Sequence, residues 1–225
     1  MDFTDMSDMV QWAETLAPVE GNWGFKVNDD FLNKYTPLVA IEALKPFKKR
    51  IFADTKMFKG TRRMINIARE LGEIGGVQYT NVFALVGRKM LKKVVEGTKD
   101  CGVEILALTV LTHMDEEYCQ EMFGRSLSDS VKLFAEIAHK AGCAGAVLPG
   151  TCLAEVQDMS LVKVVPGIRP VWYESKKANP QDQTVTPAMA VKAGADELVT
   201  SSPIFDTENP IDSLKRILEE MDSAQ

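Results

Sequence analysis

Residues 50–60 read Arg-Ile-Phe-Ala-Asp-Thr-Lys-Met-Phe-Lys-Gly and combine a strand pattern with a pair of opposite charges. The apolar run at 50–54 has the length and composition of a buried strand in a parallel sheet. Asp54 and Lys56 are two residues apart, so on a strand their side chains point to the same face and influence each other's charge. Such a pair is either a solvated ion pair worth about 0–1 kcal/mol or, at the end of a barrel strand, a pair that handles charge on a bound anion.

Six more runs of the same kind occur along the chain, with helical patterns between them. The other strands are expected at 23–27, 77–82, 104–109, 143–148, 161–165 and 196–200. Helices are expected at 7–17, 37–47, 61–73, 87–100, 127–141, 151–157, 187–193 and 208–221. Buried strands that alternate with helices predict an α/β fold built on a parallel sheet. Because no linker or composition break divides the chain, residues 1–225 are expected to form one domain.

The strand count leaves two architectures open. A closed (β/α)8 barrel needs eight strands and typically about 250 residues, whereas this chain has 225 residues and seven strand patterns. The helix expected at 7–17 has no strand pattern before it. Either the sheet is open, or the chain begins just after a first strand that it lacks.

Composition narrows the class of protein. With 45% hydrophobic and 26% charged residues, the chain is long enough and apolar enough for a sizeable core. A net charge of −6 and a pI near 5.1 give no electrostatic case for binding nucleic acid or an anionic membrane. No apolar run approaches a membrane span and no signal peptide pattern is present, so a cytoplasmic location is expected.

The histidine and cysteine contents limit the chemistry. Two histidines argue against a histidine-based triad or a multi-histidine metal site. The four cysteines lack metal-ligand spacing and are expected to be reduced core residues. If the protein is an enzyme, aspartate and lysine side chains must therefore carry the reaction.

Short motifs spread over nearly the whole chain resemble one family in their order and spacing. They are 25–27 (FKV), 106–112 (LALTVLT), 165–170 (VPGIRP), 182–183 (DQ), 186–190 (TPAMA), 193–196 (AGAD) and 202–204 (SPI). Together they resemble the orotidine 5′-phosphate decarboxylase family, (β/α)8-barrel enzymes of pyrimidine synthesis. The resemblance implies a TIM barrel whose first strand is missing or truncated, because Asp2 falls at the aspartate that closes that strand in the family.

The resemblance also implies a catalytic charge array. The family decarboxylates without a metal or organic cofactor, using interlaced aspartates and lysines beside the substrate carboxylate. Lys26, Asp54 and Lys56 are implied as three of the four charges, and Lys59 occupies the position of the fourth. A fixed carboxylate beside that of the substrate disfavours the ground state, and a nearby ammonium stabilises and then protonates the carbanion left by CO₂.

Substrate contacts follow from the same resemblance. The residues implied are Asp2, Thr112, Pro166, Ile168, Arg169 and Ser202. Asp2 is expected to touch the ribose and Thr112 to hydrogen-bond the pyrimidine. Pro166 and Ile168 are expected to line the pyrimidine pocket, in the loop that also contains Arg169.

Four positions depart from the family pattern. The family motif Asp-x-Lys-x-x-Asp ends here in Lys59, where the family has an aspartate that reaches into the partner's site across a dimer interface. Ser202 replaces the arginine of the phosphate clamp, Val171 replaces a glutamine, and Phe83 replaces a histidine. Loss of a guanidinium from a phosphate site should cost several kcal/mol of binding, because charge-assisted hydrogen bonds contribute about 1.5–3 kcal/mol each.

Three functions are consistent with these residues. The first is decarboxylation of orotidine 5′-phosphate to uridine 5′-phosphate by a homodimer with a rewired charge array. The second is action of a divergent superfamily barrel on another small anionic substrate, and the third is a catalytically impaired descendant. The expected partner is a small-molecule nucleotide, without nucleic acid, membrane, metal or organic cofactor.

Overall fold

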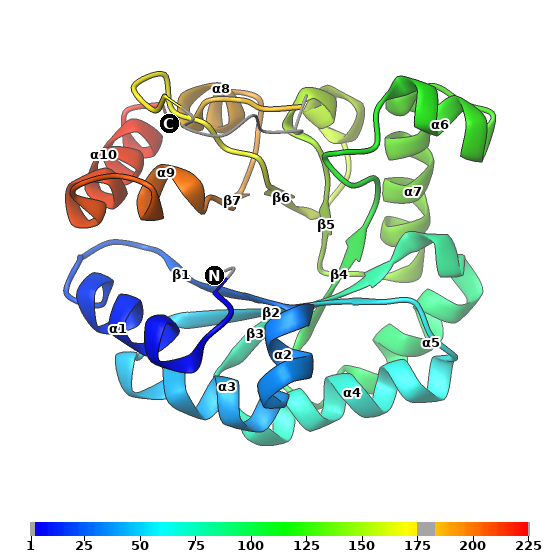
Figure 1. Ribbon diagram of the computed structural model, residues 1–225. Coiled ribbons are helices and arrows are strands. Elements are labelled where there is room, and N and C mark those ends of the chain that lie inside the picture. Colours follow the sequence, from blue (N-terminus) through cyan, green and yellow to red (C-terminus); the bar gives the residue numbers. More distant parts are fainter. Residues whose placement is uncertain (1–2, 175–182, 225) are drawn as a thin grey trace.

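The computed structural model describes residues 3–174 and 183–224, which contain one parallel sheet of seven strands. The strands follow one another in chain order, and the sheet curls so that helices cover its outer surface (Figure 1). Strand bounds are β1 Gly24–Asn28, β2 Arg50–Met57, β3 Val77–Phe83, β4 Glu104–Leu108, β5 Gly145–Val147, β6 Val162–Val165 and β7 Glu197–Leu198. All seven expected strands are present, so the prediction of a parallel α/β fold is confirmed.

Every expected helix is also present, although the one at 151–157 is a 3-10 helix. The α-helices are α1 Met6–Leu16, α2 Asp29–Tyr35, α3 Pro37–Leu44, α4 Thr61–Ile74, α5 Arg88–Thr98, α6 Glu116–Phe123, α7 Leu127–Ala141, α8 Pro187–Lys192, α9 Ser202–Phe205 and α10 Pro210–Asp222. The 3-10 helices are η1 Lys45–Phe47, η2 Ala84–Val86 and η3 Gly150–Val156. The sequence did not reveal α2, α6 and α9. No helix in the part of the chain that the structure describes is long and apolar enough to cross a membrane.

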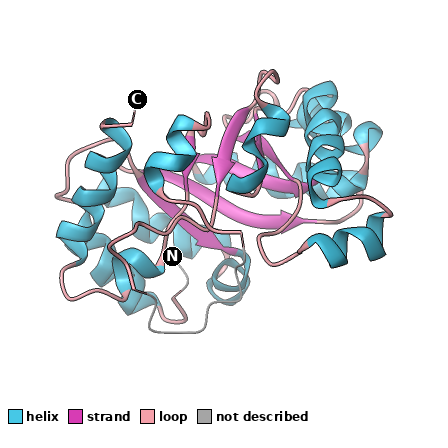
Figure 2. Ribbon diagram, turned by 90° about the horizontal axis from the view of Figure 1, so that it is seen from above, coloured by secondary structure: helices cyan, strands magenta, loops and turns pink. Residues whose placement is uncertain are grey.

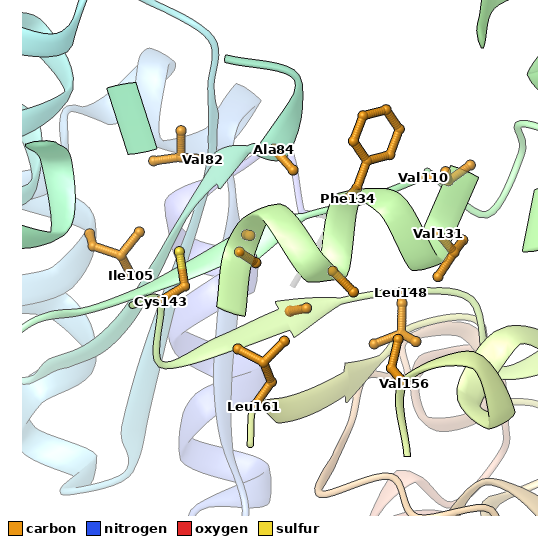
Figure 3. Close-up of a cluster of buried hydrophobic side chains, with 14 of the residues drawn as sticks. Val82, Ala84, Ile105, Val110, Val131, Phe134, Cys143, Leu148, Val156 and Leu161 are labelled. Atoms are coloured by element: carbon orange, nitrogen blue, oxygen red, sulfur yellow. The ribbon is translucent and has the colours of Figure 1, made fainter. Parts of the chain in front are cut away.

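The core has two layers because the strands are buried on both faces. Seen from above, the strands lie between helices on the outside of the molecule (Figure 2). The outer layer joins the sheet to α4, α5 and α7, and Figure 3 shows part of it, including Val131 of α7 near Leu148. The inner layer lies inside the curl and consists of Phe52, Tyr79, Leu106, Leu108, Val147 and Val164. The sheet therefore surrounds a packed interior, as in a barrel.

The sheet does not close between β7 and β1. In the described residues, β1 pairs only with β2 and β7 only with β6. A cavity of about 500 Å³ lies between these two edges, lined by β1 and β2 on one side and by β7, α9 and α10 on the other. Arg50 and Glu197, the first residues of β2 and β7, join the two sides through contacts of 2.5 and 3.2 Å. The described residues thus form a TIM barrel without its first strand, as expected.

Candidate active site

Three of the predicted residues form one row of charges. The Nζ atom of Lys26 on β1 lies 2.8 Å from Oδ2 of Asp54 on β2. The Nζ atom of Lys56, at the end of the same strand, lies 3.4 Å from that oxygen. Asp54 is 7% exposed, and the lysine side chains are 21% and 29% exposed. One buried carboxylate is therefore flanked by two partly exposed ammonium groups.

Asn81 of β3 holds this arrangement from the neighbouring strand. Its Nδ2 donates to Oδ1 of Asp54 at 2.7 Å, and its Oδ1 accepts from the backbone N–H of Lys56 at 2.7 Å. The pairing of β2 with β3 shifts register between Ala53 and Met57, so Asp54 and Lys56 lie in a bulge. Lys56 has a φ of +42° there, a strained value for a residue with a side chain.

A second carboxylate contacts Lys56 from the other side. Oδ1 of Asp29, the first residue of α2, lies 2.5 Å from the Nζ atom of Lys56. The preceding residue, Asn28, caps α2 because its side chain accepts a hydrogen bond from the N–H of Phe31 at 2.9 Å. The cap at Asn28 determines where the helix begins and therefore the position of Asp29.

The neighbouring charges determine the pKa values of the row. Burial alone would raise the pKa of Asp54, but Lys26, Lys56 and the amide of Asn81 outweigh it and hold that pKa below its ordinary value. Burial would likewise lower the pKa of Lys56, but Asp54 and Asp29 outweigh it and hold that pKa above its ordinary value. Both groups are therefore charged at neutral pH.

Acidification is expected to reduce stability through Asp54. Because its pKa is lower in the folded protein than in the unfolded chain, the carboxylate stabilises the fold above the unfolded pKa, and that contribution is lost as pH falls through the folded pKa. Urea unfolding of the protein and of Asp54→Asn should therefore give a larger difference in unfolding free energy at about pH 7 than at about pH 3. Equal differences at both values would contradict this assignment.

The cavity adjoins the charge row through a shared residue. Lys26 lines it together with three other predicted residues, Pro166, Arg169 and Ser202. Arg169 donates to the carbonyl of Ile168 at 2.9 Å, and its guanidinium lies 6.0 Å from the ring centre of Tyr173. Polar and cationic groups from the loops after β6 and β7 thus face the same space as Lys26.

The remaining predicted residues lie elsewhere or outside the described chain. Thr112 is buried beyond β4, outside the cavity lining. Ile168 is fully buried in the outer core layer, and Lys59 is exposed before α4. Asp2 is outside the described residues. The structure therefore gathers Lys26, Asp54 and Lys56 at one place and does not bring Thr112, Ile168 or Lys59 to it.

Sequence reasoning missed two residues that contact the row, Asn81 and Asp29. The available signal for Asn81 was its polar side chain, but Gln78 and Thr80 in the same strand pattern are polar too. For Asp29 it was the stretch Asn28-Asp29-Asp30, a helix-start pattern directly after a strand. Neither signal indicates which charged residue the side chain contacts in the folded protein.

Taken together, the fold and the site define a TIM-barrel protein with a row of alternating charges beside a cavity at the open edge of the barrel. Comparison with models of protein families identifies the family to which the chain belongs. The model described as "Orotidine 5′-phosphate decarboxylase / HUMPS family" matches residues 1–217. The chain belongs to this family.

Individual relatives agree with that assignment. The chain is 31% identical to the orotidine 5′-phosphate decarboxylase of Geotalea daltonii, over 98% of this chain and 93% of the relative. It is 28% identical to that of Syntrophomonas wolfei, over 99% and 95%. The fold is similar to the crystal structures of orotidine 5′-phosphate decarboxylases from Lactobacillus acidophilus, with a TM-score of 0.81, and Pyrococcus horikoshii, with 0.75. Each of these two is 22% identical, covering 98% of this chain and 96% of the other.

Proposed function

We propose that this protein decarboxylates orotidine 5′-phosphate to uridine 5′-phosphate. The observation that carries the proposal is the row Lys26–Asp54–Lys56 beside the cavity, in which the two lysine Nζ atoms lie 2.8 and 3.4 Å from Oδ2 of Asp54. The family assignment supports it, because the matching relatives have this activity in their names. The reaction is a step of pyrimidine nucleotide synthesis, and we expect it to need no metal or organic cofactor.

In the proposed mechanism, the bond between the pyrimidine ring and the substrate carboxylate breaks. Asp54 acts at its carboxylate end and Lys56 at its ring end. The carboxylate of Asp54 stands beside the carboxylate of the substrate and disfavours the ground state. The bond to the pyrimidine ring breaks, CO₂ leaves, and the electron pair stays on the ring carbon. The ammonium of Lys56 stabilises that carbanion and transfers a proton to it, and solvent then reprotonates the lysine. Lys26 holds Asp54 in place.

The nucleotide is proposed to occupy the cavity with its pyrimidine ring directed past Lys26 toward Asp54 and Lys56. Pro166 and Arg169 after β6, with Ser202 after β7, line it and would contact the substrate. The roles of Asp2, Thr112, Ile168 and Lys59 stay proposals based on family resemblance. With a serine at position 202, the site offers a neutral hydroxyl where the family has a guanidinium. We therefore expect this protein to bind the phosphate group of the nucleotide more weakly than family members with the arginine do.

Calorimetric titration with uridine 5′-monophosphate and 6-azauridine 5′-monophosphate tests this function. We expect micromolar binding of the first and tighter binding of the second, because its altered base resembles the carbanion more closely. Orotidine 5′-phosphate should be consumed with release of CO₂ under the same conditions. A folded protein that binds neither nucleotide at millimolar concentration would contradict the proposal.

We also propose a cytoplasmic homodimer. Phe58 and Leu85, which follow β2 and β3, are 63% and 42% exposed. The ring of Phe58 packs edge-on against Phe83 at 6.3 Å. Exposed apolar side chains next to a site favour a protein interface there. The four cysteines are free thiols, which fits a reducing compartment.

A further inference from the structure

Lys56 has two carboxylate neighbours. The closer one is Asp29, whose Oδ1 lies 2.5 Å from the lysine Nζ, compared with 3.4 Å for Oδ2 of Asp54. With Lys26 on the far side of Asp54, the charges alternate as lysine, aspartate, lysine, aspartate. All four side chains come from this one chain.

The local structure fixes Asp29 in this place. Asn28 caps α2 through the N–H of Phe31. The side chains of Phe31 and Leu32 anchor the helix, being 2% and 4% exposed. Asp29 is thus held in a fixed place beside Lys56.

The next residue does not share this arrangement. Asp30 is exposed, and no ion pair joins it to the row among the described residues. Lys59, at the position where the family resemblance implies an aspartate, is an exposed cation. Of the three residues, only Asp29 combines a negative charge with a contact to Lys56.

We propose that Asp29 is a positioning residue of the charge row, which orients the Nζ atom of Lys56 and keeps it protonated. The proposal rests on the proposed function, because it assigns a task within that site. Asp29 completes the row inside one protomer, so no carboxylate from a partner is needed next to Lys56. Asp29 itself acts on the substrate only through the lysine.

Steady-state kinetics of Asp29→Asn test this role, with Asp29→Glu and Asp30→Asn for comparison. We expect kcat for orotidine 5′-phosphate to fall about 10- to 100-fold in Asp29→Asn, while KM changes little, because the lysine is misplaced but the cavity is intact. The alkaline limb of the kcat–pH profile should move to lower pH, since removal of the carboxylate lowers the pKa of Lys56. Asp29→Glu should recover part of the loss, and Asp30→Asn should behave as the unchanged protein.

An NMR titration of Lys56 keeps the test independent of turnover. The pKa of its ammonium should be lower in Asp29→Asn than in the unchanged protein and unaffected in Asp30→Asn. If the unchanged protein neither binds nucleotide nor decarboxylates, the proposed function fails, but this titration still shows whether Asp29 acts on Lys56. An unchanged Lys56 pKa, or a kcat and pH profile unaffected by Asp29→Asn in an active enzyme, would overturn the proposal.

Discussion

Replacement of Lys56 by alanine is expected to lower kcat for orotidine 5′-phosphate by about a thousandfold or more. In the proposed mechanism, the substitution removes the cation that stabilises the carbanion and also the proton that the ring carbon receives. No other described ammonium takes over this place, because Lys26 is paired with Asp54 at 2.8 Å on the opposite side of the carboxylate. Binding of uridine 5′-monophosphate should change much less than kcat, since in the proposed mechanism Lys56 stabilises a charge that develops only in the transition state.

A matched lysine separates this effect from a general loss of positive charge. Lys92 on α5 is 60% exposed and pairs with Glu96 at 3.7 Å on the surface. Its replacement by alanine should leave kcat unchanged and shift the melting temperature only slightly. Single-turnover measurements on both variants would show whether the chemical step is affected. A Lys56→Ala protein within tenfold of the unchanged rate would remove Lys56 from the mechanism.

The sequence predicts the strands well because parallel strands are buried on both faces. Short stretches rich in apolar and β-branched residues, such as 50–54 and 77–82, with helical patterns between them, are typical of strands in a parallel sheet. Strand ends are less certain, since the run 143–148 contains only the short β5, Gly145–Val147. The missed helices have weak signals. Helix α9 has four residues, and α2 begins with two aspartates that by themselves indicate a loop as well as a cap.

The site is less predictable than the fold, because it depends on contacts between strands. The spacing of Asp54 and Lys56 already places them on one face. Asn81 joins them only because the pairing of β2 with β3 shifts register, and the sequence does not specify such a shift. Asp29 joins them because the chain turns into α2 directly after β1. Both contacts are long-range in sequence and short in space.

Introduction of arginine at position 202 is expected to tighten the binding of uridine 5′-monophosphate about 10- to 100-fold. Ser202 is the first residue of α9 and lines the cavity. Two of the cations there have carboxylate partners, Lys26 with Asp54 and Arg50 with Glu197. A guanidinium at position 202 would add charge-assisted hydrogen bonds to the phosphate, each worth about 1.5–3 kcal/mol, and about 1.4 kcal/mol corresponds to tenfold in affinity.

The comparison with uridine makes this prediction specific to the phosphate. Uridine has the same base and ribose without the anion, so its affinity should be the same for Ser202→Arg and the unchanged protein. Ser202→Gln controls for the length of the side chain and should bind the nucleotide without the gain. Calorimetry at low and high salt should show the gain shrinking as salt increases, because ions screen an exposed charge pair. An equal gain for uridine, or none for the nucleotide, would mean that the phosphate lies away from α9. In that case, the absence of the family arginine would not explain a low affinity for the substrate.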